Sequence, residues 1–313
     1  MDLARGSMRL VLDARTAAFA TLIDYAGLFP PASLSVEDAV GEYRRIRAGA
    51  SAWVGGRFLC RASQLADLAS VATRTFAAGE TPWEVSVIFD GTPGESAALA
   101  KDFHAEMDPV MVVAAAEARL GGAANVAVDP LIDSMLSIAP EVVPFIEVDR
   151  SRSIKEQVDS VATTLESRRR VGGVKLRCGG EAVDSFPTPG EVAEFIAASV
   201  DARMPFKATA GLHQPIRHFD DNLGLERHGF VNLLIATALA EAGEDRATIE
   251  HVIAETDPDA FAMSAAFASW RDRKVPGSAL RRMRHSGFVA YGSCDFNEPT
   301  EALIELGFMG QGE

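Results

Sequence analysis

Three stretches of this sequence have the composition of buried β-strands but carry charged side chains. They are VVPFIEVD, GVKLRC and PFKATAGL, at residues 142–149, 173–178 and 205–212. Successive side chains of a strand point to opposite faces, so turning the apolar ones toward covering helices leaves the charged ones on the other face. That face then collects Glu147, Lys175, Arg177 and Lys207. Burying such groups without partners costs several kcal/mol each, so the pattern predicts either an ion-pair network or a chemical site.

Lysine is rare in this chain, and two of its lysines lie in these stretches. Only five of the 30 basic residues are lysine, and the others are arginine. A lysine that is desolvated beside another cation can lose its proton near neutral pH, whereas arginine stays charged. A neutral amine attacks a carbonyl carbon to form a Schiff base. We therefore expect Lys175 and Lys207 to lower each other's pKa and to provide such an amine.

Strand and helix patterns alternate along almost the whole chain and would position these residues. The predicted strands are residues 21–29, 53–60, 83–90, 110–117, 142–149, 173–178, 205–212 and 288–294. The predicted helices are residues 35–48, 63–73, 93–107, 130–138, 153–169, 189–202, 229–242 and 299–306. Such alternation predicts an α/β fold with a parallel sheet, and eight units match a closed (β/α)8 TIM barrel, although a doubly wound open sheet gives a similar list.

Helix starts are marked by a repeated capping signal. The letters TPGE occur at residues 92–95 and again at 188–191. In this arrangement the threonine hydroxyl accepts an unpaired backbone N–H, the glutamate reaches back, and proline suits the first helical position. Both copies stand a few residues after a predicted strand, where a loop between strand and helix should end.

Two segments lie outside the eight units. Residues 1–20 are predicted to form an N-terminal helix that plugs the bottom of the barrel. Residues 244–287, before strand eight, are predicted to be a helical insert with helices at 246–255 and 260–270, which we interpret as packing or an oligomer contact rather than a lid. No linker divides the chain, so we expect one barrel domain over residues 1–313 and a homo-oligomer.

The loops at the carboxyl ends of the strands supply further candidates, because barrel enzymes keep their chemistry there. His213 follows the strand of Lys207 and is the best histidine for general acid–base work, although a loop histidine bonded to backbone is an equal alternative. An anion would be bound by a guanidinium and by backbone N–H groups beside glycines. The substrate-binding candidates are Arg177, Thr209, Gly179, Gly211 and the interior acid Asp24.

The three cysteines are interpreted as free thiols. Cys60, Cys178 and Cys294 are far apart, odd in number and without metal-ligand spacing, which is typical of a reducing compartment. All three end predicted strands, so a thiolate or metal site together with His213 is conceivable, but chance placement is favoured. GxSxG, HExxH, Walker and GxGxxG motifs are absent, and we expect neither a metal nor a cofactor.

The two lysine segments resemble a known group of enzymes. VKLRCGG, followed some thirty residues later by FKATAG, is similar to strands six and seven of class I aldolases of the deoxyribose-phosphate aldolase type. The resemblance implies that Lys175 forms the Schiff base and that Lys207 tunes it. The acid expected on strand four has no clear equivalent, since residues 110–117 offer only Glu117 at their end. We expect Glu147 on strand five to serve instead.

Composition and charge restrict the partners. The chain has a formal net charge of −14, which disfavours nucleic acid and anionic membranes. Its longest nearly uncharged stretch, residues 230–240, is too short to span a bilayer, and the first twenty residues do not have a signal-peptide pattern. We expect a cytoplasmic protein whose partner is a small anionic molecule.

These observations predict a carbon–carbon lyase that acts on a small carboxylated or phosphorylated carbonyl compound. Lys175 would attack the carbonyl, and Glu147 or His213 would move protons. One alternative is a metal-dependent barrel lyase or hydrolase with Glu147, Glu117, Asp24 or His213 as ligands. Another is a non-catalytic barrel that binds a small anion or builds an assembly through residues 244–287.

Overall fold

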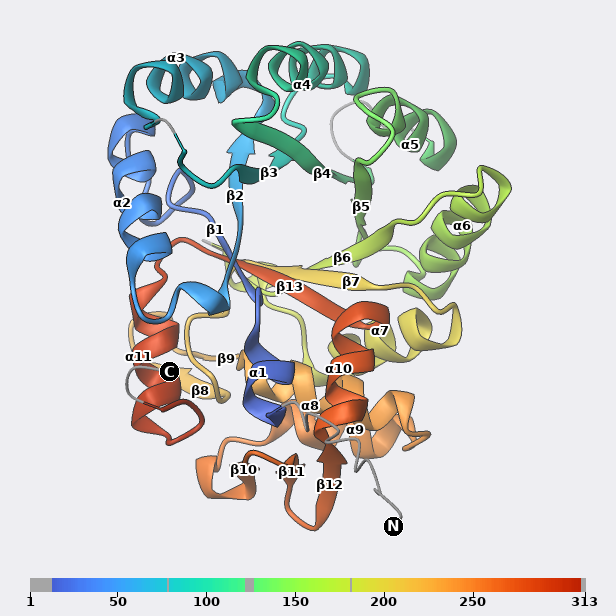
Figure 1. Cartoon of the computed structure of the whole chain (residues 1–313). Coiled ribbons are helices and arrows are strands. Elements are labelled where there is room, and N and C mark those ends of the chain that lie inside the picture. Colours follow the sequence, from blue (N-terminus) through green and yellow to red (C-terminus); the bar gives the residue numbers. More distant parts are fainter. Residues whose placement is uncertain (1–12, 78, 122–126, 181, 311–313) are drawn as a thin grey trace, which may run out of the picture.

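The computed structural model describes residues 13–77, 79–121, 127–180 and 182–310, and its strands close into a parallel barrel. The strand order around the barrel is β1-β13-β7-β6-β5-β4-β3-β2. These strands are β1 Ile23–Tyr25, β2 Gly55–Arg61, β3 Trp83–Ile88, β4 Met111–Arg119, β5 Val143–Glu147, β6 Gly173–Arg177, β7 Phe206–Thr209 and β13 Phe288–Ser293. Figure 1 shows them as the inner ring of the molecule, with helices outside. The predicted (β/α)8 TIM barrel is confirmed.

A helix follows each barrel strand, as the sequence predicts. These helices are α2 Val36–Ala48, α3 Leu65–Thr75, α4 Pro93–Met107, α5 Val128–Leu136, α6 Ile154–Ser167, α7 Pro189–Asp201, α8 Phe230–Glu241 and α11 Asn297–Glu305. Short 3-10 turns occupy Ala52–Val54, Ala62–Gln64, Val183–Ser185 and Pro258–Ala260. Both TPGE segments form complete capping boxes with proline in the first turn. Local capping chemistry thus fixes where α4 and α7 begin.

The segment before β13 is only partly helical, which corrects one prediction. Helix α9, Arg246–Ala254, and helix α10, Gly277–Ser286, agree with a helical region. Residues 260–270, however, do not form a helix. Most of them form two strands, β10 Phe261–Met263 and β11 Phe267–Trp270, of an antiparallel sheet that β12 Arg273–Pro276 completes. The alanine-rich letters favour a helix locally, but pairing with β12 decides the conformation.

The N-terminal helix is short in the described residues. Helix α1, Ala14–Phe19, packs on α10 and β11, and the side chains of Ala14, Ala18 and Phe19 are fully buried. Residues 1–12 of the predicted helix lie outside the described residues. A hairpin of β8 His218–Asp220 and β9 Leu225–Arg227 interrupts the loop after β7.

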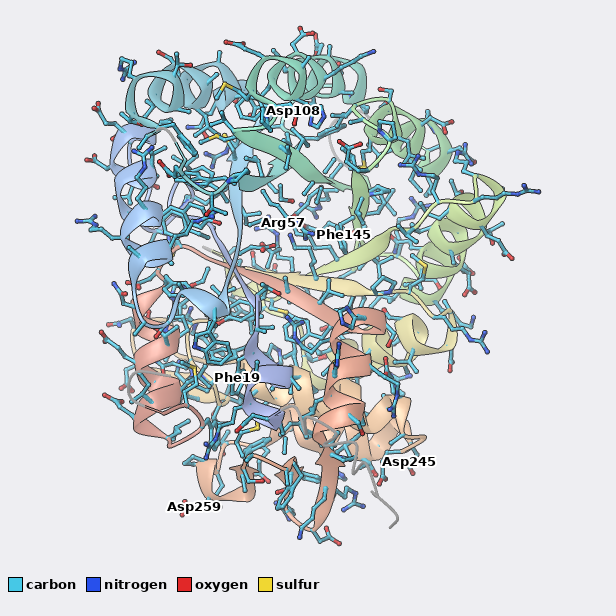
Figure 2. The ribbon with its side chains drawn as sticks, viewed as in Figure 1. Phe19, Arg57, Asp108, Phe145, Asp245 and Asp259 are labelled. Atoms are coloured by element: carbon cyan, nitrogen blue, oxygen red, sulfur yellow. The ribbon has the colours of Figure 1, made fainter. Side chains whose placement is uncertain are left out.

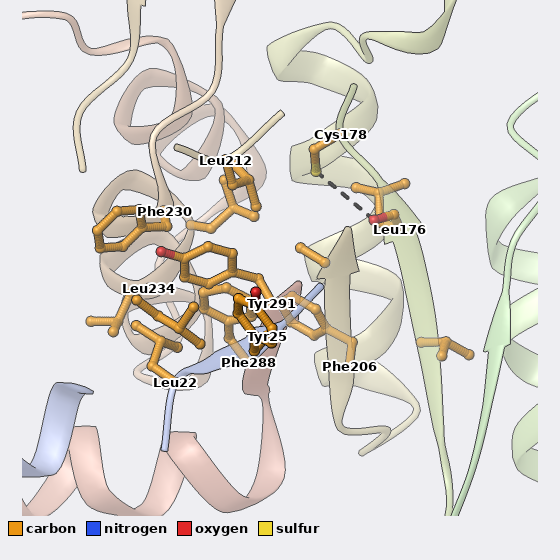
Figure 3. Packing of buried hydrophobic residues seen from close by; sticks show 14 of the residues in the cluster. Leu22, Tyr25, Leu176, Cys178, Phe206, Leu212, Phe230, Leu234, Phe288 and Tyr291 are labelled. Carbon is orange, nitrogen blue, oxygen red and sulfur yellow. Dashed lines mark hydrogen bonds between the residues drawn. The ribbon is translucent and has the colours of Figure 1, made fainter. Parts of the chain in front are cut away.

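Aromatic residues fill the space between the barrel wall and α8. Tyr291 of β13 stacks on Phe230 of α8 with ring centroids 5.0 Å apart, and Phe206 stacks on Phe288 at 5.4 Å. Figure 3 shows these four rings as one group, in which Phe288 also stacks on Tyr291. Because these rings face the covering helices, the opposite face of each strand is left for the barrel interior.

Among the described residues, no helix is long and apolar enough to cross a membrane.

A buried histidine should make stability depend on pH. The Arg217 guanidinium can only donate, so the His228 Nδ1 atom 3.0 Å away accepts, and Nε2–H donates to the Pro187 carbonyl at 2.6 Å. Burial is the main reason why the pKa of His228 falls to about 4. The unfolded chain takes up this proton near pH 6.5, so stability should fall by roughly 3 kcal/mol as pH falls from 6.5 to 4.

Urea unfolding between pH 4 and 7 measures this effect. The variant His228→Gln keeps a donor toward the Pro187 carbonyl but does not titrate, so its stability should change less over this range than that of the wild type. His251→Asn, on the exposed side of α9, is the matched control and should keep the wild-type slope. Equal slopes for the wild type and His228→Gln would refute the assignment.

Candidate active site

Two lysines from neighbouring strands share one carboxylate in the barrel interior. Lys175 of β6 and Lys207 of β7 are register partners. The Lys175 Nζ atom lies 2.8 Å from Glu117 Oε2, and Lys207 Nζ donates to Glu117 Oε1. Glu117 lies on β4, on the far side of β5, so these contacts cross the barrel interior. The inward direction predicted for the two lysines is confirmed.

Further acids extend this contact in both directions. Lys207 Nζ lies 2.5 Å from Asp24 Oδ2, and Lys175 Nζ lies 3.2 Å from Glu147 Oε2. The other Glu147 oxygen accepts from Arg177 Nε at 3.1 Å. Acids and bases therefore alternate along a row that we call the carboxylate–amine chain: Asp24, Lys207, Glu117, Lys175, Glu147 and Arg177. All of these are buried except Arg177, whose side chain is 45% exposed.

Neighbouring backbone and side chains hold the acids in place. Asp24 Oδ1 accepts from the Arg57 backbone N–H at 2.7 Å, and a Cβ added to Gly56 would stand 2.3 Å from that oxygen, so glycine is required there. Ser86 Oγ donates to Glu117 Oε1 at 2.7 Å. The Phe145 ring lies inside the ring of strands, with its centroid 5.4 Å from Lys207 Nζ (Figure 2). The site is thus assembled from β1, β2, β3, β4 and β5 as well as the two lysine strands.

The resting charge of Lys175 differs from the prediction. Burial by itself would lower the pKa of this amine, but the carboxylates of Glu117 and Glu147 outweigh burial and raise the pKa above its ordinary value. Burial likewise would raise the pKa of both acids, yet Lys175 and the second cation beside each acid hold it below the ordinary range. The expected lowering of the Lys175 pKa by Lys207 is wrong, because a carboxylate stands between the two amines.

Sequence reasoning underestimated Glu117. It placed this residue at the end of a strand, whereas β4 continues to Arg119 and Glu117 faces the interior. A strand-four acid is therefore present beside both lysines, and Glu147 does not replace it but pairs with Lys175 and Arg177. The sequence signal for this role is a single charged residue in a run of alanines, AAAEA at residues 114–118. In the preceding strand, the alternation of side chains turns Ser86 toward the interior as well.

The structure does not bring His213 into the carboxylate–amine chain. Its Nδ1 atom lies 2.9 Å from Glu298 Oε2, and its Nε2 atom lies 3.7 Å from Cys294 Sγ. The alternative of a histidine bonded to backbone is not observed either, since both of these partners are side chains. A proton-transfer role for His213 beside the lysines therefore finds no geometric support.

The two glycines predicted to bind an anion serve loop packing. A Cβ on Gly179 would stand 2.8 Å from the Gly211 Cα atom, and a Cβ on Gly211 would stand 2.8 Å from the Cys178 carbonyl oxygen. Gly211 also has a φ of +74°, which favours glycine. Thr209, just before this turn, is the register partner of Arg177 at the carboxyl end of the barrel.

A cavity of about 1060 Å³ opens at the amino ends of the strands, opposite to Arg177. It extends inward to Asp24 and Phe145, and helix α1 contributes Thr16 and Ala17. Its lining includes residues that begin or precede strands, among them Gly55, Val143 and Pro205, and residues of helix α10. Helix α1 therefore lines the bottom of the barrel without filling it.

The residues suggested as metal ligands are engaged elsewhere. Asp24, Glu117 and Glu147 each contact a lysine, and His213 lies in a separate cluster. Within the described parts of the chain, no group of three or more histidine, cysteine, aspartate or glutamate side chains is arranged to hold a metal ion.

The fold and this interior define the class of the protein: a (β/α)8 barrel, an architecture common among enzymes, with two buried lysines among carboxylates. Comparison with protein-family models, with curated proteins and with solved structures finds no match to this chain.

Proposed function

We propose that the protein is a carbon–carbon lyase that forms a Schiff base between Lys175 and a small anionic carbonyl compound. The observation that carries this proposal is the sharing of Glu117 by two buried lysines. Each lysine is held between two carboxylates, but Lys175 is the more suitable nucleophile because it is 6% exposed and Lys207 only 1%. Such an arrangement places an amine, a proton acceptor and a fixed cation within contact distance.

The chemistry begins with a proton transfer, because Lys175 is an ammonium in the resting arrangement. Glu117, 2.8 Å from Nζ, accepts that proton when a carbonyl group approaches. The amine then bonds to the carbonyl carbon, and the π electrons move to the oxygen. That oxygen takes one proton from the nitrogen and one back from Glu117, and it leaves as water to give a protonated imine. In a β-hydroxy substrate Glu117 next takes the hydroxyl proton, the electron pair of the carbon–carbon bond moves toward the imine, and the bond breaks. The departing fragment leaves as an aldehyde, and an enamine remains on Lys175. Contact with Lys207 helps to lower the pKa of Glu117 and so limits the basicity of that carboxylate.

Arg177 supports an anionic substrate. Its guanidinium stands at the carboxyl end of β6, where barrel enzymes bind substrates, and its side chain is 45% exposed while Nε contacts Glu147. Because only Nε is held by Glu147, the other N–H groups of this exposed guanidinium can bind a carboxylate or phosphate. Thr209, its register partner on β7, offers a hydroxyl at the same level.

A second candidate function is a non-catalytic barrel, which the complete pairing of the charges favours. Three acids and three bases balance along the carboxylate–amine chain. A balanced network of this kind can close a barrel interior with no reaction at all. The two candidates differ in whether Lys175 can be captured by a carbonyl compound.

Reductive trapping separates these candidates. The protein is incubated with small carboxylated and phosphorylated aldehydes and ketones plus borohydride, and the intact mass and peptide masses are measured. We expect one adduct per chain at Lys175, and at least a tenfold smaller yield in Lys175→Met, whose side chain keeps the length of the apolar stem. Lys155→Ala, an exposed lysine paired with Asp159, is the control and should trap as the wild type does.

Two results would count against the proposal. An adduct that persists in Lys175→Met would place the reactive amine elsewhere. No adduct with any compound, in a protein whose circular dichroism is that of the folded wild type, would favour the non-catalytic barrel.

A further inference from the structure

A second cluster of reactive side chains lies at the carboxyl end of the barrel. Cys294 directly follows β13, His213 lies in the loop after β7, and Glu298 is in the first turn of α11. Strands β13 and β7 are paired, which brings the first two residues together although 80 residues separate them. Cys294 Sγ lies 3.7 Å from His213 Nε2, and His213 Nδ1 lies 2.9 Å from Glu298 Oε2.

The carboxylate of Glu298 determines which nitrogen of His213 carries the hydrogen. Glu298 can only accept, so the Nδ1 atom of His213 carries a hydrogen and donates it, which leaves Nε2 facing the thiol. Gln214 Nε2 donates to the other Glu298 oxygen at 2.9 Å, and the Glu298 backbone N–H donates to Asp295 Oδ1 at 3.1 Å. The contact with Cys294 is the main reason why the pKa of His213 is raised; burial opposes the rise and Glu298 adds to it. Nε2 is therefore prepared to take the thiol proton.

The other two thiols differ in their surroundings. Burial raises the pKa of both Cys60 and Cys178 to about 12. The Cys178 thiol points back to the carbonyl of Leu176, as Figure 3 shows, and the Cys60 thiol is directed to the Arg61 carbonyl. These two thiols are internal standards for an unactivated cysteine in the same protein.

We propose that Cys294 is a nucleophilic thiol that takes a small, uncharged carbon electrophile of the aldehyde class, with His213 as the proton carrier and Glu298 as the residue that positions His213. A small molecule is required because Cys294 is 8% exposed and the His213 side chain is 14% exposed. An uncharged one is favoured because the carboxylates of Glu298 and Asp295 border the pair. The cluster shares no residue with the carboxylate–amine chain, so the inference does not depend on the proposed lyase.

The step balances within these groups. The thiol proton moves to His213 Nε2, and the sulfur pair bonds to the carbonyl carbon. The π electrons move to the carbonyl oxygen, which takes the proton back from Nε2 and leaves a hemithioacetal. With iodoacetamide the same sulfur pair displaces iodide from carbon, so alkylation reports the reactivity of the thiolate.

The test measures alkylation rates of the folded protein, with peptide masses that separate the three cysteines. At pH 6 we expect iodoacetamide to alkylate Cys294 at least a hundredfold faster than Cys60 and Cys178. The rate is followed from about pH 5 to 9, because a histidine that takes the thiol proton changes the pH profile of alkylation. Relative to a free cysteine peptide, the anionic reagent iodoacetate should react with Cys294 at least tenfold less than the neutral reagent does.

Variants assign the roles. His213→Asn should lower the Cys294 rate at pH 6 at least tenfold and change the pH profile of that rate, and Glu298→Gln should do the same to a smaller extent. His251→Asn, an exposed histidine on α9, should change nothing. The inference is overturned if Cys294 reacts as slowly as the two buried thiols, or if the pH profile of its rate is unchanged in His213→Asn. A normal profile in Glu298→Gln would remove the positioning role.

Discussion

Replacing Glu117 with glutamine is expected to lower the free energy of unfolding by about 3 to 5 kcal/mol at pH 7. The amide keeps the size of the side chain but removes the negative charge shared by Lys175 and Lys207. Both ammonium groups are buried, and one of the three carboxylates that compensate them is lost. Urea unfolding of Glu117→Gln and of the wild type measures the difference.

The control is an acid of the same type that faces solvent. Glu84 of β3 pairs with Arg57, and its side chain is 59% exposed. An exposed pair contributes about 0 to 1 kcal/mol, so Glu84→Gln should remain within that range of the wild type. If Glu117→Gln loses no more stability than Glu84→Gln, the central position assigned to Glu117 is wrong.

With His228→Gln as the background, so that the histidine no longer titrates, the variant Lys207→Met should become more stable as pH falls from 7 to 5. It leaves Asp24 and Glu117 buried with one shared cation removed, at a cost of about 3 to 5 kcal/mol at pH 7. Glu117 keeps its contact with Lys175, whereas Asp24 keeps no lysine partner. Uptake of a proton by the variant relieves the uncompensated buried negative charge, so the folded state binds more protons and stability increases as pH falls.

The wild type should respond in the opposite sense at lower pH. The pKa of Glu117 and that of Glu147 are held below the ordinary value by the cations around them. Their contribution to stability is therefore present above about pH 4.3 and is lost as pH falls through the lowered folded pKa. Urea unfolding from about pH 3 to 7.5 compares the wild type, His228→Gln and His228→Gln/Lys207→Met.

A double variant adds an internal check. Because Glu117 and Lys207 are in contact, the combined loss in Glu117→Gln/Lys207→Met should be smaller than the sum of the two single losses by at least about 1 kcal/mol. Additive losses, or parallel pH curves for His228→Gln/Lys207→Met and His228→Gln, would show that the two groups are not coupled.

Most of the architecture follows from short-range signals. The boundaries of α4 were predicted at residues 93–107 and are found there, because the capping box and proline act within one helical turn. The segment 260–270 was predicted as a helix and is part of a sheet, because its partner strand, β12, is recognised only when the chain folds back. Helix signals are local, whereas antiparallel pairing depends on a second segment.

The sequence alone determined which side chains of β5, β6 and β7 face the interior, since a strand's alternation repeats every two residues and needs no partner. Only the tertiary structure decided what they meet there. Lys207 and Glu117 are 90 positions apart, and their contact across the barrel gives Lys175 a carboxylate neighbour instead of a second amine. The pairing of β7 with β13 likewise places His213 beside Cys294. Residue type and direction are local properties, but a pKa depends on charges a few ångströms away, which the folded chain alone brings together.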